Sequence, residues 1–171
     1  MSEKFVFDKT SPDANKYTEL DKFLQLTERF SKMNLGPMKL ANKVGSKFGL
    51  FKHSKPYSAL QRTLKIVEAD GIEEVYDDLM HSERIQRSDI FIGKKYLFRQ
   101  GNYMIRMKDV ERCYVMDEQS GDDRLYYCYV DVSDEAGSEK LEIRKLSALT
   151  VQRQQQFDMI NVPIEKAKQS Q

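Results

Sequence analysis

The sequence predicts an α+β protein, in which an N-terminal helical region precedes a small, strongly bent antiparallel sheet that a C-terminal helix closes. Apolar residues recur at helical spacing up to about residue 87, and from Ser88 onward they come in short runs separated by Gly, Asp and Ser. The helical pattern returns near the end of the chain, where Leu149, Phe157 and Ile160 share one side. We therefore expect a helical region over residues 1–87 and a β-domain with its closing helix over 88–171.

The N-terminal half contains helix start and stop signals. In "SPDA", residues 11–14, the serine can cap a helix and the next two residues suit a first turn. Ser54 and Pro56 predict a second start, and "EADG" predicts an end at Gly71. The clearest set at positions i, i+3, i+4 and i+7 follows directly: Ile72, Val75, Tyr76 and Leu79.

The second half contains short β-type segments. Gly93 and the Gly101-Asn102 pair separate the first of them, and "EQSGDD" predicts a hairpin loop between two longer ones. "SDEAGSEK" predicts a linker before the last strand. The expected strands lie within residues 89–93, 95–100, 102–107, 110–117, 124–132 and 141–146.

Several segments of this half, taken in order, carry a family resemblance. They are "DIFIGKKYLF", "YMIRMKDVERCYV", "YYCYVDVSD" and "EKLEIRKL", followed by the final helix. This order resembles the bacterial pleckstrin-homology-like domains, in which an Asp and an aliphatic residue open a strand, here Asp109 and Val110. The resemblance implies a scaffold that binds peptide, lipid or partner protein, and it implies no catalytic residue. The phosphoinositide site of eukaryotic members needs clustered basic residues, and Lys94, Lys95 and Arg99 are too few to carry that site over.

The sequence offers little for catalysis or for cofactor and metal binding. It contains no glycine-rich phosphate loop after a strand and no CxxC pair, and His53 and His81 are isolated from each other. We expect no cofactor and no metal site, and we interpret His81 as a cap at the C-terminal end of a helix. Cys113 and Cys128 lie in apolar runs, where we expect buried free thiols rather than a disulfide.

Two groups of residues could carry a function, although each has a simpler explanation. The acidic pairs Glu73-Glu74 and Asp77-Asp78 could act in acid–base chemistry, but they alternate with the apolar helix stripe and are expected to face solvent. The tyrosines of "RLYYCYV" could stack on single-stranded nucleic acid, with Tyr127 and Tyr129 on one face of a strand and Tyr126 on the other. The acids that flank this run would repel phosphates: Asp122, Asp123 and Asp131.

Charges are divided between two blocks, although the formal net charge of the 171 residues is only +1. Arg29 to Lys65 contains nine Lys or Arg and no acid, whereas Glu68 to Glu83 contains seven acids and no Lys or Arg. Within the basic block, three lysines at i, i+4 and i+8 lie beside an apolar stripe, as in a basic amphipathic helix. The candidate contact residues there are Lys39, Lys43, Lys47, Phe48 and Phe51.

Three environments for this basic segment stay open. The lysines can face solvent or the acidic helix at 72–80, which is the interpretation that we favour, or they can contact a protein partner or an anionic membrane surface. The chain has no apolar window of 18 residues, and "MSEKFVFDKT" has charges where a signal peptide needs an apolar run, so we expect a cytoplasmic protein. The leading functional hypothesis is a non-enzymatic binding or scaffold module. The alternatives are membrane-surface association through residues 38–57, and an enzyme whose site is assembled from residues distant in sequence.

Overall fold

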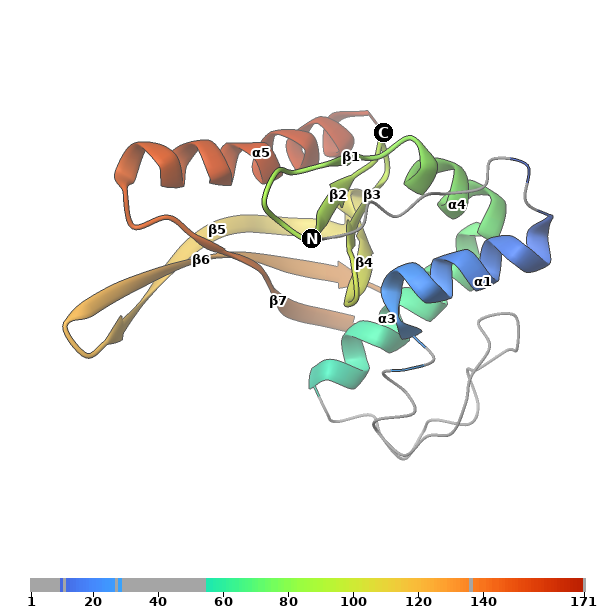
Figure 1. Cartoon of the computed structure of the whole chain (residues 1–171), viewed down its shortest axis with the longest axis horizontal. Coiled ribbons are helices and arrows are strands. Elements are labelled where there is room, and N and C mark those ends of the chain that lie inside the picture. Colours follow the sequence, from blue (N-terminus) through green and yellow to red (C-terminus); the bar gives the residue numbers. More distant parts are fainter. Residues whose placement is uncertain (1–9, 11, 27, 29–54, 136, 171) are drawn as a thin grey trace. The chain divides into compact units, whose positions relative to one another are not determined.

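A computed structural model describes residues 10, 12–26, 28, 55–135 and 137–170 (Figure 1). It contains helices, antiparallel strands and a C-terminal helix, which confirms the predicted α+β class. The chain divides into two compact units. The first combines the described residues up to Arg84 with Asp89–Ile105, and the second combines Ile85–Ser88 with the chain from Arg106 onward.

The first unit holds three helices: α1 (Asp13–Leu24), α3 (Lys55–Asp70) and α4 (Ile72–Met80). The N-cap of α1 is Pro12, whose side chain makes no capping hydrogen bond. The predicted cap, Ser11, lies outside the described residues. Helix α3 has Pro56 in its first turn, as predicted. Gly71 ends α3 at a φ of 90°, a backbone conformation that side chains with a Cβ rarely adopt.

The same unit contains a four-stranded sheet in the order β1-β2-β3-β4. Strands β1 (Glu83–Arg84) and β2 (Ile90–Ile92) are antiparallel, as are β2 and β3 (Tyr96–Arg99). Strand β4 (Tyr103–Arg106) completes the sheet. The Gly101-Asn102 turn separates β3 from β4, as the sequence predicted.

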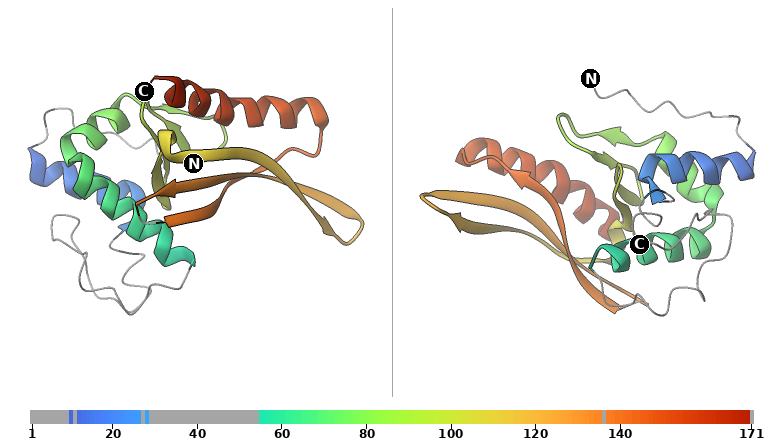
Figure 2. Two further views of the ribbon diagram at one scale, coloured as in Figure 1. Left: turned by 180° about the vertical axis from the view of Figure 1, so that it is seen from behind. Right: turned by 60° about the horizontal axis from the view of Figure 1, so that its bottom comes forward.

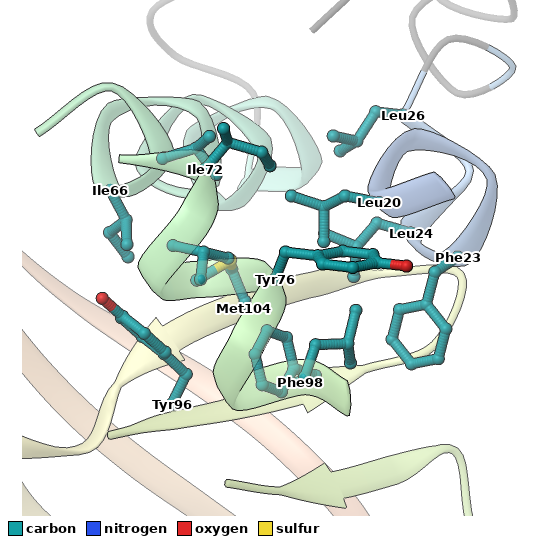
Figure 3. Close-up of a cluster of buried hydrophobic side chains, with 13 residues drawn as sticks. Leu20, Phe23, Leu24, Leu26, Ile66, Ile72, Tyr76, Tyr96, Phe98 and Met104 are labelled. Carbon is teal, nitrogen blue, oxygen red and sulfur yellow. The ribbon is translucent and has the colours of Figure 1, made fainter. Parts of the chain in front are cut away.

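Helices and strands of the first unit share one hydrophobic core (Figure 3). The ring of Phe23 on α1 meets the rings of Phe91 and Phe98 edge to face, with centroids 5.1 and 6.5 Å apart. The buried members of the core are Leu20, Phe23, Leu24, Leu26, Ile66, Val67, Ile72, Val75, Tyr76, Leu79, Tyr96, Phe98 and Met104.

This core contains residues from both sides of the boundary predicted between residues 87 and 88. Strand residues Tyr96, Phe98 and Met104 complete the core formed by α1, α3 and α4, so β3 and β4 belong with the helices. The hydroxyl of Thr63 on α3 adds a polar link, since it accepts the N–H of Met104 at 3.1 Å and donates to the carbonyl of Ala59 at 2.9 Å. The change of pattern at Ser88 therefore marks a change of secondary structure and not a change of core.

The second unit contains a separate three-stranded sheet, where the sequence predicted that a single bent sheet would hold all the strands. A short 3-10 turn (η2, Met107–Asp109) leads into β5 (Val110–Ser120), β6 (Asp123–Asp134) and β7 (Gly137–Leu146), which pair antiparallel in that order. The predicted hairpin within "EQSGDD" is present and tight, with Gly121 at a φ of 62°. The predicted linker "SDEAGSEK" is wrong, because most of it extends β6 and β7.

Helix α5 (Thr150–Gln169) runs along one side of this sheet (Figure 1). Alternate residues of β6 point toward it, which buries Cys128, Val130 and Val132 with Ile160 and Ile164 of the helix. The next residues of β6 in this alternation, Tyr127, Tyr129 and Asp131, therefore belong to the opposite face of the sheet.

The start of α5 differs from the predicted pattern. The N-cap is Leu149, so this residue lies outside the helical stripe in which the sequence placed it and is 62% exposed. The side chain of Ser147 still accepts the N–H of Leu149 at 3.1 Å. At the other end, the helix extends to Gln169.

Strands β5 and β6 extend further than β7. The pairing of β7 with β6 covers Tyr126 to Asp134, whereas β5 pairs with β6 as far as Ser120 and Asp123. The hairpin therefore continues past the end of β7 as a two-stranded ribbon (Figure 2). All residues from Val115 to Arg124 are exposed.

Asp109, which directly precedes β5, provides a test of stability against pH. Partial burial raises the pKa of its carboxyl and Asp134 adds to the rise, while the nearby Arg106 guanidinium, 3.4 Å away, opposes it. Because the folded-state pKa lies above the unfolded one, ionisation costs stability at neutral pH, and this cost disappears as the pH falls through the folded pKa. We expect the wild type to gain stability relative to Asp109→Asn between pH 7 and pH 4. Urea denaturation at both pH values measures this, and a relative loss on acidification would mean that the Arg106 pair dominates.

Candidate binding surface

The candidate contact residues that the sequence singled out lie outside the described residues. These are Lys39, Lys43, Lys47, Phe48 and Phe51, and His53 lies outside them as well. His81 is described, and it caps the C-terminal end of α4 as predicted. Its Nδ1 atom lies 2.8 Å from the carbonyl oxygen of Asp77, and its backbone N–H donates to the same carbonyl.

One prediction about the acids of α4 is wrong. Glu73, Glu74 and Asp77 are exposed as expected, but Asp78 is only 8% exposed. Its carboxylate accepts three backbone N–H groups, from Lys94 at 2.8 Å, Lys95 at 3.1 Å and Tyr96 at 3.0 Å. Asp78 therefore holds the turn between β2 and β3 against α4.

Other acids of the same block also contact this turn. Glu74 pairs with Lys95, which raises the pKa of that lysine, and Asp70 accepts the hydroxyl of Tyr96 at 2.6 Å. The sequence suggested the basic block from Arg29 to Lys65 as the counterpart of these acids. Lys95 lies outside that block, so part of the acidic charge is balanced by the turn before β3.

A cluster of tyrosines lies on the face of the β5–β7 sheet opposite α5. We call this surface the tyrosine face. It consists of Tyr114, Tyr127, Tyr129, Arg112, Met116 and Lys140. The rings of Tyr114 and Tyr129 stack at 20° with centroids 6.2 Å apart, and Tyr127 meets Tyr129 edge to face at 6.5 Å. The strand register causes this, because Tyr114 is directly opposite Tyr129 and Met116 is opposite Tyr127.

Cations lie over the two stacked rings. The guanidinium carbon of Arg112 lies 4.1 Å from the centroid of Tyr114, and Nζ of Lys140 lies 4.5 Å from that of Tyr129. Lys140 also reaches the sulfur of Met116, at 2.9 Å. The side chains from three strands thus support one another across the whole face.

The two hydroxyls at the centre of the face are oriented by acids. Tyr114 donates to Asp131 at 2.9 Å, and Tyr129 donates to Glu142 at 3.4 Å. Partial burial and the nearby acid raise the pKa of each tyrosine, so both hydroxyls stay protonated donors at neutral pH. Arg112 pairs with Asp131 at 3.2 Å, so this end of the face carries balanced charge.

The sequence predicted only part of this surface. Tyr126 is on the helix side, where Arg153 of α5 stacks on it at 3.8 Å, so the predicted split between Tyr126 and its two neighbours is confirmed. Tyr114, Arg112 and Lys140 were missed. Their alternation along β5 and β7 is visible in the sequence, but only the strand register places them beside Tyr129.

Comparisons with protein-family models, curated proteins and solved structures found no match. Within the described ranges, no three His, Cys, Asp or Glu side chains gather as metal ligands would. None of the helices that the structure describes has the length and apolar character that crossing a membrane requires.

Proposed function

We propose that this chain is a non-enzymatic binding module and that the tyrosine face is its contact surface for a protein partner. The observation that carries the proposal is the pre-ordered stack of Tyr114 and Tyr129 on the sheet face that α5 leaves open. Tyrosine, arginine and methionine are enriched in interface cores. Rings that are already held by neighbours lose little further freedom when a partner binds.

The pleckstrin-homology-like resemblance supports the same proposal. Strand β5 begins at Val110, directly after Asp109, and the strands are followed by one C-terminal helix. The resemblance implies a scaffold that binds peptide, lipid or partner protein, which agrees with a contact surface on this chain. The proposed partner is a protein rather than a nucleic acid, since Asp131 and Glu142 bond to the tyrosines of the face and would oppose a phosphate backbone.

Affinity capture from extract of the native host, with wild type and variants compared in parallel, tests the proposal. The test variant is Tyr114→Ser/Tyr129→Ser, and the control is Val151→Ser/Val162→Ser, which removes two apolar side chains from the exposed side of α5, where they are 71% and 59% exposed. We expect the test variant to bind the captured partner roughly 30-fold more weakly, which corresponds to about 2 kcal/mol. We expect the control to bind it normally.

The purified partner then gives the dissociation constants, and circular dichroism shows whether each variant remains folded. Equal affinity of a folded test variant and the wild type would rule out the tyrosine face as the contact. A partner that fails to bind the α5 control but binds the test variant would move the contact to the helix.

A second candidate function rests on the basic segment 38–57, which carries five lysines and no acid. We propose it as the alternative contact, with an anionic membrane surface, where each basic residue adds about 1 kcal/mol. Co-sedimentation with vesicles of phosphatidylcholine, with and without phosphatidylserine, separates this alternative from the first. Binding that needs phosphatidylserine and is lost in Lys39→Glu/Lys43→Glu/Lys47→Glu would favour it, whereas equal recovery in both supernatants would exclude it.

A further inference from the structure

The two cysteines of the chain face each other across the β5–β6 ladder. Cys113 is opposite Val130 and Cys128 is opposite Val115, so the cysteines occupy a diagonal pair on the helix-facing side of the sheet. Their sulfur atoms lie 3.7 Å apart, and both thiols are free. A disulfide bond measures about 2.05 Å, so its formation requires the sulfurs to approach by about 1.7 Å.

The two thiols have different surroundings. Cys113 is half-buried and so the more accessible of the two residues, whereas Cys128 is fully buried in the core of the second unit. The hydrogen bond with Cys113 and burial raise the pKa of Cys128, and the positive charge of Arg144, opposite Cys128 on β7, acts in the other direction. Cys113 is therefore the thiol that meets an oxidant, and Cys128 is held beside it as a proton-bearing partner.

We propose that Cys113 and Cys128 form a redox site in which a hydroperoxide converts the two thiols into a cross-strand disulfide. The thiolate of Cys113 attacks the peroxide, which breaks the O–O bond and leaves Cys113 as a sulfenic acid. The leaving oxygen takes up the proton that the Cys113 thiol released, so the peroxide is reduced to an alcohol or water. The sulfur of Cys128 then displaces the hydroxyl group from Cys113. The thiol proton of Cys128 leaves with that hydroxyl as water, so two thiols and one peroxide yield one disulfide.

The paired strands favour reaction within one chain. The ladder places Cys128 beside Cys113, so the sulfenic acid meets Cys128 before it meets a thiol of another molecule. A diagonal cross-strand position is not a relaxed one for a disulfide, and dithiothreitol is therefore expected to reduce the bond readily.

The thiol pair also adjoins the tyrosine face. Tyr114 follows Cys113 directly and Tyr129 follows Cys128, with their rings on the opposite side of the same two strands. Drawing the sulfurs together moves the backbone at the stacked pair. The chain has nine tyrosines and no tryptophan, so its near-ultraviolet spectrum reports such a change.

Peptide mapping after peroxide treatment tests the proposal on the full chain. Trypsin separates the cysteines, because Cys113–Arg124 and Leu125–Lys140 are different peptides. After treatment with a few equivalents of hydrogen peroxide, we expect these peptides to be linked in most molecules, with loss of both reactive thiols and recovery of both by dithiothreitol. Met116 lies in the first peptide, so its sulfoxide is counted separately.

Two variants separate the roles of the thiols. Cys128→Ser is expected to stop at a Cys113 sulfenic acid that dimedone traps, and Cys113→Ser is expected to leave the buried Cys128 at least ten-fold slower to oxidise. Sulfinic or sulfonic acid at Cys113 without linked peptides in the wild type would overturn the proposal. Linked peptides found only in covalent dimers on a non-reducing gel would overturn it as well. The result does not depend on the proposed binding function, because the readout is the bond itself.

Discussion

Replacement of Asp78 by alanine is expected to lower the free energy of unfolding by about 3 kcal/mol or more, because three backbone donors lose their acceptor together. The carboxylate holds the N–H groups of Lys94, Lys95 and Tyr96 at the end of α4. Asp78 is only 8% exposed, so water has little access to replace it. Urea denaturation followed by circular dichroism measures the loss.

Asp77→Ala is the matched control for this change. It removes the same side chain from the neighbouring position of the same helix, but the side chain of Asp77 is 68% exposed and the imidazole that it contacts at 3.5 Å, that of His81, is 66% exposed. We expect a change of less than about 0.5 kcal/mol. Equal effects of the two substitutions would contradict the assigned role of Asp78.

Gly93→Ala is expected to destabilise the protein by a similar amount for a steric reason. A Cβ atom at Gly93 would lie 2.1 Å from Oδ2 of Asp78 and 2.5 Å from its carboxyl carbon, far inside contact distance. The φ of Gly93 is not in the left-handed region, so the glycine is required for space and not for its backbone freedom. We expect a loss of about 2–4 kcal/mol in the same denaturation measurement.

The double variant Asp78→Ala/Gly93→Ala tests whether the two effects have one cause. With the carboxylate absent, the methyl group of the alanine at position 93 no longer overlaps with it. The double variant should therefore lose less free energy of unfolding than the sum of the two single losses, by at least about 1 kcal/mol. Additive effects would show that the added methyl group strains the turn by itself.

The spacing of apolar residues predicted the helices and strands because it shows which face of each one is buried. Ile72, Val75, Tyr76 and Leu79 are spaced for one helix face, and all of them are buried. The six predicted strands lie close to β2–β7, since alternation and turn residues are local signals, but the two-residue strand β1 was not predicted. Asp78 was misjudged because its position beside Asp77 suggests a solvated pair, while its actual partners are 16 to 18 residues away in sequence.

The composition change near Ser88 does not coincide with the division into compact units, for a similar reason. It shows where helices give way to strands, but it does not show which strands pack on which helices. Phe98 and Met104 join the core of α1 and α4 because long-range contacts decide core membership. The sequence shows which residues are apolar, but it does not show which residues they pack against.

The residue order alone was sufficient for the α+β class, the helix stripes, the tight hairpin around Gly121 and the division of tyrosines between the two sides of β6, since all of these depend on neighbours within a few residues. Only the tertiary structure decided that Tyr114 stacks on Tyr129, that Cys113 lies beside Cys128, and that Asp78 holds the turn at Gly93. Each of these contacts depends on strand register or on packing between distant segments. A shift of one residue in that register would turn the tyrosine rings of the shifted strand toward α5 and its thiol away from α5, because successive side chains of a strand point to opposite sides.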